Sequence, residues 1–174
     1  MTISIALEER QLLSPGDKPG APPVILRFAR LSDNGFIGRL SREVFTAYGP
    51  YDDILSGWFK SDKRITTIIA SQDRKRIGFA MLGDPYNRDE LQDVSELLGI
   101  AVEPEKQGKG IGGLLLSAIE RASVSLEIKC VFLHTAVDNL SARKLYERNG
   151  YRTLEIKRNF YPEGQDAIVM YKNI

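Results

Sequence analysis

The stretch Val102–Glu120, VEPEKQGKGIGGLLLSAIE, places four glycines and two lysines between an apolar run and a helical pattern. A strand, a glycine turn and a helix can together bind an anion. The first amides of a helix have no partner within it, and the helix dipole adds positive charge there. Glycine also lets the backbone approach a ligand closely, and Lys109 adds a full charge.

One common nucleotide motif is excluded by the spacing of these glycines. The segment contains no GxxxxGK[ST]. The glycines could also form only a tight turn with close helix packing. We favour anion binding, because four glycines beside a lysine within six residues exceed what a turn needs.

The rest of the composition limits the chemistry. Cys130 and His134 are the only cysteine and histidine, which excludes an internal disulfide and disfavours a Cys/His zinc site. A formal net charge of +1 gives no global field that attracts nucleic acid or an anionic membrane. The N-terminal MTISIALEER lacks the features of a targeting peptide, and no apolar run approaches membrane-spanning length. We expect a cytoplasmic protein without a metal ion.

The N-terminal segment differs from the rest of the chain. SPGDKPGAPP, Ser14–Pro23, is too rich in proline and glycine for a helix or a central strand. Residues 1–23 are therefore expected to be an arm, either loose or forming a short added strand, ahead of one domain over residues 24–174.

Hydrophobic periodicity predicts strands and helices in the domain. Expected strands cover residues 24–33, 64–71, 76–83, 95–102, 129–137, 151–159 and 166–173, and expected helices cover 32–45, 52–60, 110–126 and 139–150. DPYNRDELQD, residues 84–93, is expected to be a loop. A helix that connects Ser95–Val102 to Lys129–Val137 requires these two strands to be parallel. The pattern predicts an α/β fold with a mixed sheet and helices on both faces.

Two segments resemble a known family. QGKGIG, Gln107–Gly112, resembles the [RQ]-x-x-G-x-[GA] turn of the GNAT superfamily of acyl-CoA-dependent N-acyltransferases. NLSARKLYERNGY, Asn139–Tyr151, resembles that family's N-x-x-A-x-x-L-Y-x-x-x-G-[FY] helix. The resemblance covers residues 24–172. It implies a mixed, mostly antiparallel, seven-stranded sheet with a splayed parallel strand pair.

The resemblance also implies acetyl-CoA as co-substrate. Its diphosphate would lie on the amides of the glycine turn, and its pantetheine arm would extend between the splayed strands like an added strand. A strand amide could also polarise the thioester carbonyl. The implied acetyl-CoA-binding residues are Ile100, Ala101, Val102, Gln107, Gly108, Lys109, Gly110, Ile111, Gly112, Gly113, Asn139 and Tyr146.

Acetyl transfer to an amine needs a base for the attacking ammonium and a proton donor for the departing thiolate. Tyr146 is the candidate donor, because Asn139, Ala142 and Tyr146 share one face of a helix. Asn139 is expected to cap this helix, and Gly150 to end it. Tyr146 could instead be a packing residue whose hydroxyl binds a neighbour.

Two residues are candidates for the base. Glu96 lies eleven positions before Gln107, where the histone-acetylating members of the superfamily carry a catalytic glutamate. His134 lies twelve positions before Tyr146, where some protein N-terminal acetyltransferases place a catalytic histidine and bacterial ribosomal-protein enzymes a glutamate. The two could share the work through water. Alternatively, Glu96 is a solvated strand residue and His134 a hydrogen-bonded core residue.

The C-terminal segment suggests the acceptor. IKRNFYPEGQDAIVM, Ile156–Met170, resembles the K/R-x-N-[YF]-Y … D-A loop of protein N-terminal acetyltransferases, including the ribosomal-protein kind. Two aromatics of that loop help to clamp a peptide; here they are Phe160 and Tyr161, and Phe160 lacks the hydroxyl. An α-amine also deprotonates more readily than a lysine amine. The opposite wall could be formed by Tyr48, Tyr51 or Asp52.

The resemblance thus implies acetylation of a peptide or protein α-amine, for example on a ribosomal protein. Three alternatives remain open. The acceptor could be a small amine, in a pocket lined by residues 84–93, or a protein lysine, which Glu96 would suit. The chain could also be a non-catalytic acyl-CoA-binding module, although Tyr146 and two candidate bases argue against this. The oligomeric state stays open.

Overall fold

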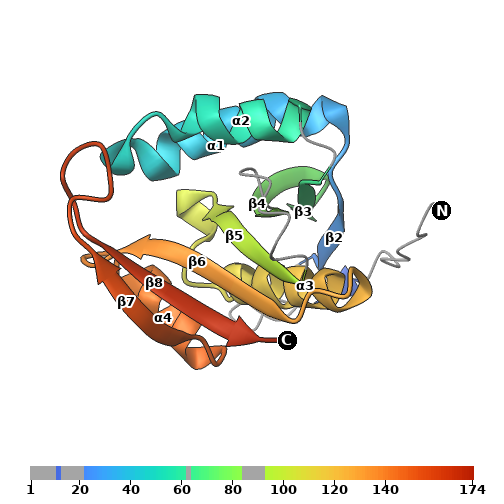
Figure 1. Ribbon diagram of the computed structural model, residues 1–174. Helices are drawn as coiled ribbons and strands as arrows, with labels where there is room; N and C mark the ends of the chain where they lie inside the picture. Colours follow the sequence, from blue (N-terminus) through green and yellow to red (C-terminus); the bar gives the residue numbers. More distant parts are fainter. Residues whose placement is uncertain (1–10, 13–21, 62–63, 84–92) are drawn as a thin grey trace.

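The computed structural model describes residues 11–12, 22–61, 64–83 and 93–174. They form an α/β structure in which the expected elements recur in the expected order (Figure 1). The strands are β1 (Gln11–Leu12), β2 (Val24–Phe28), β3 (Thr66–Gln72), β4 (Lys75–Gly83), β5 (Val94–Val102), β6 (Cys130–Ala136), β7 (Arg152–Lys157) and β8 (Ala167–Asn173). The helices are α1 (Asn34–Phe45), α2 (Tyr51–Ser61), α3 (Ile111–Ser125) and α4 (Leu140–Arg148), with 3₁₀ turns η1 (Leu31–Asp33), η2 (Thr46–Tyr48) and η3 (Pro104–Lys106).

The strands form one mixed sheet in the order β1-β2-β3-β4-β5-β6-β8-β7. All neighbouring strands are antiparallel except β5 and β6, which are parallel as the crossover through α3 requires. Strands β2 to β8 are the seven expected ones. The two-residue β1 pairs with β2, so part of the N-terminal arm does add a short strand to the sheet edge. Residues 1–10 and 13–21 of the arm and residues 84–92 of the expected loop lie outside the described part.

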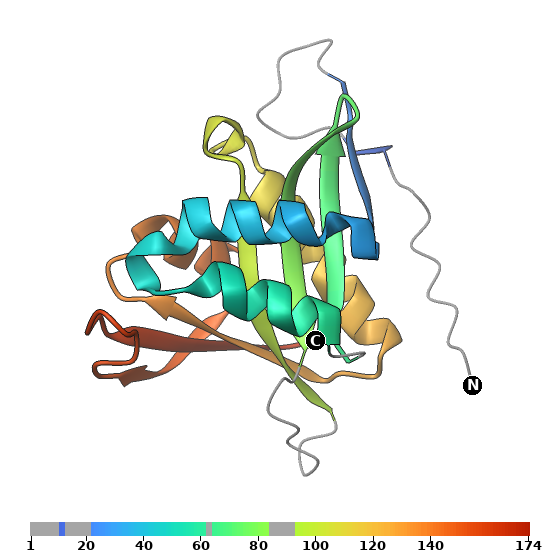
Figure 2. The ribbon, with the colours of Figure 1, turned by 90° about the horizontal axis from the view of Figure 1, so that it is seen from above.

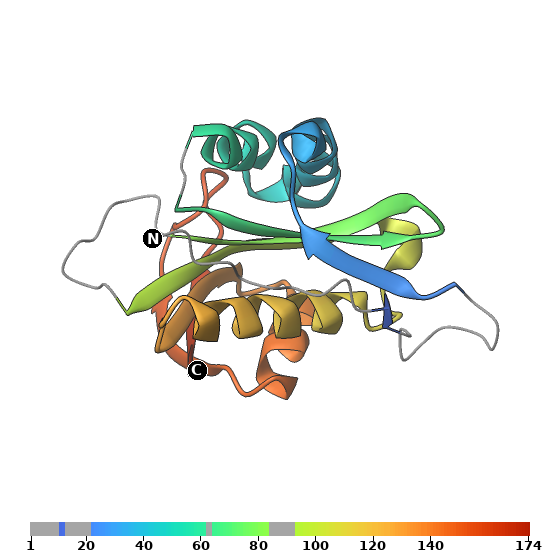
Figure 3. The ribbon, with the colours of Figure 1, turned by 90° about the vertical axis from the view of Figure 1, so that its right-hand side faces the viewer.

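Helices cover both faces of the sheet (Figure 3). Helices α1 and α2 lie side by side over one face (Figure 2), where Ile37, Leu40 and Leu55 are fully buried. Helix α3 packs on the opposite face through residues such as Leu115, Leu116 and Ile119, whose spacing repeats the helical period. The fold class implied by the resemblance is therefore confirmed.

The first strand is shorter than expected. The sequence predicted a strand over residues 24–33, but β2 ends at Phe28 and the chain turns through η1. The cause is the Asp33 carboxylate, which accepts the backbone N–H of Arg30 at 2.7 Å and two hydrogen bonds from the Arg27 guanidinium. A local side-chain interaction of this kind competes with strand pairing.

The parallel strands β5 and β6 separate partway along their length. Their pairing runs from Val94–Cys130 to Leu97–Leu133 and then stops. On their other sides, β5 stays paired with β4 through Val102, with a bulge opposite Met81 and Leu82, and β6 stays paired with β8 through Ala136. A bulge bends its strand and re-aims the side chains beside it. The expected splay is present, and it opens the sheet at Leu98–Ile100 and His134–Ala136.

Candidate active site

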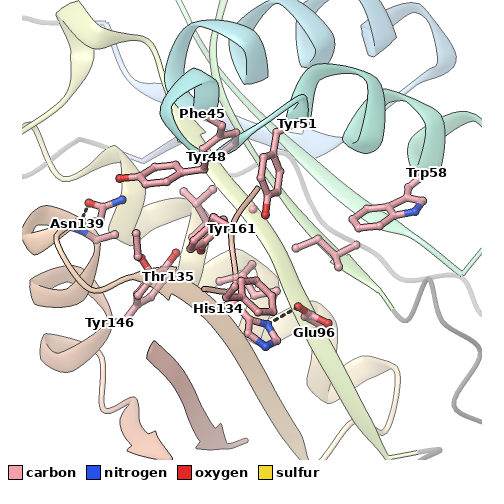
Figure 4. Close-up of a pocket in the computed structure, with 17 residues that line it drawn as sticks. Phe45, Tyr48, Tyr51, Trp58, Glu96, His134, Thr135, Asn139, Tyr146 and Tyr161 are labelled. Atoms are coloured by element: carbon pink, nitrogen blue, oxygen red, sulfur yellow. Dashed lines mark hydrogen bonds and ion pairs between the residues drawn. The ribbon is translucent and has the colours of Figure 1, made fainter. Parts of the chain in front are cut away.

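A cavity of about 120 Å³ lies at the splay (Figure 4). Its walls come from the α1–α2 corner, the middle of β5, the end of β6, one face of α4 and the β7–β8 hairpin. The lining residues are Phe45, Tyr48, Tyr51, Trp58, Glu96, Leu97, Leu98, Gly99, Ile100, His134, Thr135, Ala136, Asn139, Ala142, Tyr146, Phe160 and Tyr161. All three predicted catalytic residues and both predicted acceptor-binding aromatics therefore meet in one cavity.

Glu96 and His134 form a pair on the floor of this cavity. Glu96 projects from β5 and His134 from β6, on the face opposite to their buried neighbours Leu97 and Leu133. Glu96 Oε1 lies 2.8 Å from His134 Nδ1 (Figure 4). The two side chains are only about one-tenth exposed. A carboxylate that holds one imidazole nitrogen orients the other for proton transfer.

The β7–β8 hairpin closes the cavity with aromatic rings. The Phe160 ring stacks on the His134 imidazole, with centroids 4.5 Å apart and planes 5° from parallel. Tyr161 contacts Tyr48 and Tyr51 across the cavity, with centroid distances of 5.1 Å and 6.3 Å. Gln165 donates to the carbonyl of Ala47 at 2.6 Å, which attaches the hairpin to the α1–α2 corner.

Two of the three residues predicted for the wall opposite Phe160 and Tyr161 do line the cavity. Tyr48 and Tyr51 line the cavity, as Figure 4 shows. Asp52 does not line it, because its carboxylate is turned to Arg42, 2.7 Å away. The pKa of Asp52 is lowered by the hydrogen bond from the Arg42 guanidinium. Its role is thus to join α1 to α2.

Helix α4 presents the face that the sequence predicted. Asn139, Ala142 and Tyr146 all line the cavity. The Asn139 side chain accepts the backbone N–H of Ala142 at 3.1 Å, so Asn139 caps the helix as expected. Gly150 follows the helix with φ of +87°, as a C-terminal glycine should. Burial raises the pKa of Tyr146, so its hydroxyl stays protonated near neutral pH.

The glycine turn contains two residues in the left-handed backbone region, directly before α3. Gly108 and Gly110 have φ of +73° and +84°, in the left-handed region that favours glycine. Gly110 precedes the first residue of α3, Ile111. A Cβ on Gly112 would lie 3.3 Å from Leu145 Cδ2, so this glycine also permits the close approach of α3 and α4. The packing interpretation therefore applies to Gly112, while anion binding by the turn stays a prediction.

The turn lies outside the walls of the cavity. Gln107 donates to the carbonyl of Val102 at 3.0 Å and so attaches the turn to the end of β5. Of the predicted acetyl-CoA-binding residues, the cavity includes Ile100, Asn139 and Tyr146. The other predicted residues do not line the cavity. They lie on the last two residues of β5, in the glycine turn and at the start of α3: Ala101, Val102, Gln107, Gly108, Lys109, Gly110, Ile111, Gly112 and Gly113.

Sequence reasoning missed several residues of the site. Phe45, Trp58 and Thr135 line the cavity, and Lys157 contacts His134. Trp58 is the only tryptophan, and Lys157 belongs to the hairpin segment Ile156–Met170. Neither fact shows from the sequence alone that the residue lies at the cavity. Within the described residues, no group of three or more His, Cys, Asp or Glu side chains could hold a metal ion. Nor does that part contain a helix long and apolar enough to cross a membrane.

Comparison with known proteins identifies the class. The profile of the acetyltransferase (GNAT) family matches residues 35–151. The chain belongs to this family and is an N-acyltransferase.

Relatives within the family differ in how much of the chain they match. An uncharacterized N-acetyltransferase of Methanocaldococcus jannaschii is 27% identical over 86% of this chain and 91% of its own length. An N-alpha-acetyltransferase of Sulfurisphaera tokodaii is 26% identical over 83% and 90% of the two chains. A [ribosomal protein bS18]-alanine N-acetyltransferase of Salmonella typhimurium is 35% identical, over 45% of this chain and 55% of its own length.

A solved structure supports the fold. An acetyltransferase of Salmonella typhimurium, determined with acetyl-CoA, has a TM-score of 0.76 at 17% identity and covers 86% of this chain and 93% of that chain. At this identity the match shows the fold alone.

Proposed function

We propose that this protein transfers the acetyl group of acetyl-CoA to the α-amine of a peptide or protein, in the cytoplasm. The observation that carries the proposal is the Glu96–His134 pair beneath the Phe160 and Tyr161 rings, in the same cavity as Tyr146. This arrangement supplies a base, an aromatic clamp and a proton donor around one reaction centre.

The base acts first in the proposed reaction. The acceptor arrives as an ammonium and loses a proton to the Glu96–His134 pair, because a protonated amine has no lone pair. The amine nitrogen then attacks the thioester carbonyl, whose oxygen would be polarised by a backbone amide of β5. As the C–S bond breaks, Tyr146 donates its proton to the sulfur. The acylated nitrogen then loses its second proton, which restores the Tyr146 hydroxyl, and the base releases the first proton to solvent. The products are the N-acetyl acceptor, the free thiol of CoA and one released proton.

An extended chain suits the cavity better than a compact amine does. Tyr48 and Tyr51 on one side of the cavity, and Phe160 and Tyr161 on the other, offer flat rings and hydroxyls, as a clamp on a peptide backbone requires. Relatives named for ribosomal-protein alanine and N-alpha acetylation favour the same class of acceptor. A ribosomal protein is therefore among the acceptors to test.

The test is free-thiol release from acetyl-CoA with a panel of acceptors. Each peptide is supplied with a free and with a blocked N-terminus, alongside lysine-containing blocked peptides, polyamines and amino acids. We expect release only with free N-termini. Release with blocked peptides that contain lysine would assign side-chain acetylation, and release only with small amines would overturn the peptide proposal. Tight acetyl-CoA binding without release to any acceptor would indicate a binding module.

Substitution of the base tests the mechanism separately. Glu96→Gln and His134→Ala should each lower kcat by about 10² or more and change the pH profile, since positioned general bases contribute this much. Glu147→Gln, on the exposed surface of α4, makes the same change of charge away from the cavity and serves as the control. Wild-type pH–rate curves in both active-site variants would refute the assignment of the base.

A further inference from the structure

The second nitrogen of the His134 ring is also occupied. Lys157 Nζ, from the end of β7, lies 3.2 Å from His134 Nε2. The same ammonium lies 5.8 Å from the centroid of the Phe160 ring. The imidazole is thus held between Glu96 on one nitrogen and Lys157 on the other, while Phe160 covers one ring face.

The chemistry of the two partners decides which ring nitrogen carries the proton. An ammonium can only donate a hydrogen bond, so Nε2 must accept it through its lone pair. The carboxylate of Glu96 can only accept, so Nδ1 must carry the hydrogen that it receives. Glu96 and Lys157 together select the neutral Nδ1–H tautomer, with the basic lone pair on Nε2.

Lys157 makes the contacts that an acceptor ammonium would need. Before it is deprotonated, the acceptor must place its ammonium on the lone pair of the base, beside the aromatic clamp. The Lys157 ammonium already has this hydrogen bond and this position over an aromatic ring. We propose that Lys157 is a resident competitor of the acceptor amine: it holds the base in the reactive tautomer and leaves Nε2 when the acceptor binds. This inference rests on the proposed function, because it takes His134 to receive the acceptor's proton.

A second partner for the displaced lysine is close by. Glu155 Oε1 lies 3.9 Å from Lys157 Nζ, and both side chains are about half exposed. The neighbouring Arg158 is engaged separately by Asp166. Lys157 can therefore turn from His134 to Glu155 without losing its charged environment.

Kinetics test the competition. Lys157→Met removes the ammonium and keeps a side chain of similar length. The KM for the acceptor should then fall about 3- to 10-fold, because Nε2 is already available and no lysine has to leave it before the acceptor binds. Lys157→Arg retains a cationic donor and should keep a KM near that of the wild type. Loss of a purely structural contact would not lower KM. An unchanged or raised KM in Lys157→Met would overturn the proposal.

Nuclear magnetic resonance tests the contact without any activity. His134 is the only histidine, so untagged protein gives one pair of ring nitrogen signals. We expect a protonated Nδ1 and an unprotonated Nε2 in the wild type, and a change of the Nε2 signal in Lys157→Met that Lys157→Arg does not show. A protonated Nε2, or the same signal in all three proteins, would refute the contact. If no peptide is acetylated, the proposed function fails, and these spectra still decide the role of Lys157.

Discussion

The Tyr146 hydroxyl is the candidate proton donor, and its burial favours the protonated form. Its side chain is 7% exposed in the wall of the cavity. Burial disfavours the phenolate and raises the pKa of Tyr146. The group therefore remains a neutral acid near neutral pH, which is what a donor to the departing thiolate requires.

Removal of this hydroxyl should slow the chemical step. Tyr146→Phe should lower kcat by about 10² with little change in the KM for acetyl-CoA, since a positioned acid acts mainly in the transition state. Tyr151→Phe removes a second buried hydroxyl that does not line the cavity, and should leave kcat near the wild-type value. Steady-state thiol release measures both. Equal losses in the two variants would argue for a packing role of Tyr146.

The turn before α3 is the element on which acetyl-CoA binding should depend. Gly110 has φ of +84° and ψ of 0°, where a side chain costs about 1 kcal/mol or more. Gly110→Ala should therefore shift the turn and raise the Kd for acetyl-CoA, by about tenfold if the turn supplies the diphosphate amides.

A second glycine gives the matched control for this prediction. Gly57 lies in α2, and a Cβ there would meet nothing within 4 Å. Gly57→Ala should leave the affinity unchanged and stabilise the helix slightly. Calorimetric titration of both variants with acetyl-CoA measures the two Kd values for comparison with the wild type. An unaltered Kd in Gly110→Ala would place the diphosphate elsewhere.

Over the whole molecule, one buried carboxylate joins segments that lie far apart in the sequence. Asp33, only 1% exposed, pairs with Arg27 of β2 at 2.7 Å and with Arg76 of β4 at 3.1 Å. Hydrogen bonding from the Arg27 guanidinium lowers the pKa of Asp33 to about 2. Removal of one member of a buried ion pair costs about 3 kcal/mol, because the other is left unpaired.

Stability should therefore depend on Asp33 in a defined pH window. Because the folded-state pKa is depressed, the contribution is present above the unfolded value of 3.8 and is lost as the pH falls toward about 2. Asp33→Asn should lower the free energy of unfolding in urea by about 3 kcal/mol at pH 7 and by less at pH 2. Asp73→Asn, on an exposed turn, is the control. An equal loss at both pH values would exclude a contribution of the carboxylate charge.

Local patterns in the sequence determined most of the elements. The period of Leu115, Leu116 and Ile119 predicts a buried helix face, and the glycines at 108 and 110 mark the turn before it. Asn139 predicted a cap that the structure shows. These features depend on residues within one or two turns of each other, so the sequence alone can specify them. The early end of β2 was missed because Asp33 is also held by Arg76 of β4, 43 positions along the chain, which a local pattern does not show.

The sequence predicted several residues of the site, but not the contacts between their side chains. The sequence predicted Glu96 and His134 as alternative bases or as partners through water, and their direct contact at 2.8 Å depends on the parallel register of β5 and β6. The contact of Lys157 with His134 likewise needs β7, β8 and β6 to lie side by side. Contacts between residues 23 or 38 positions apart depend on strand order and register, which packing of the whole sheet decides.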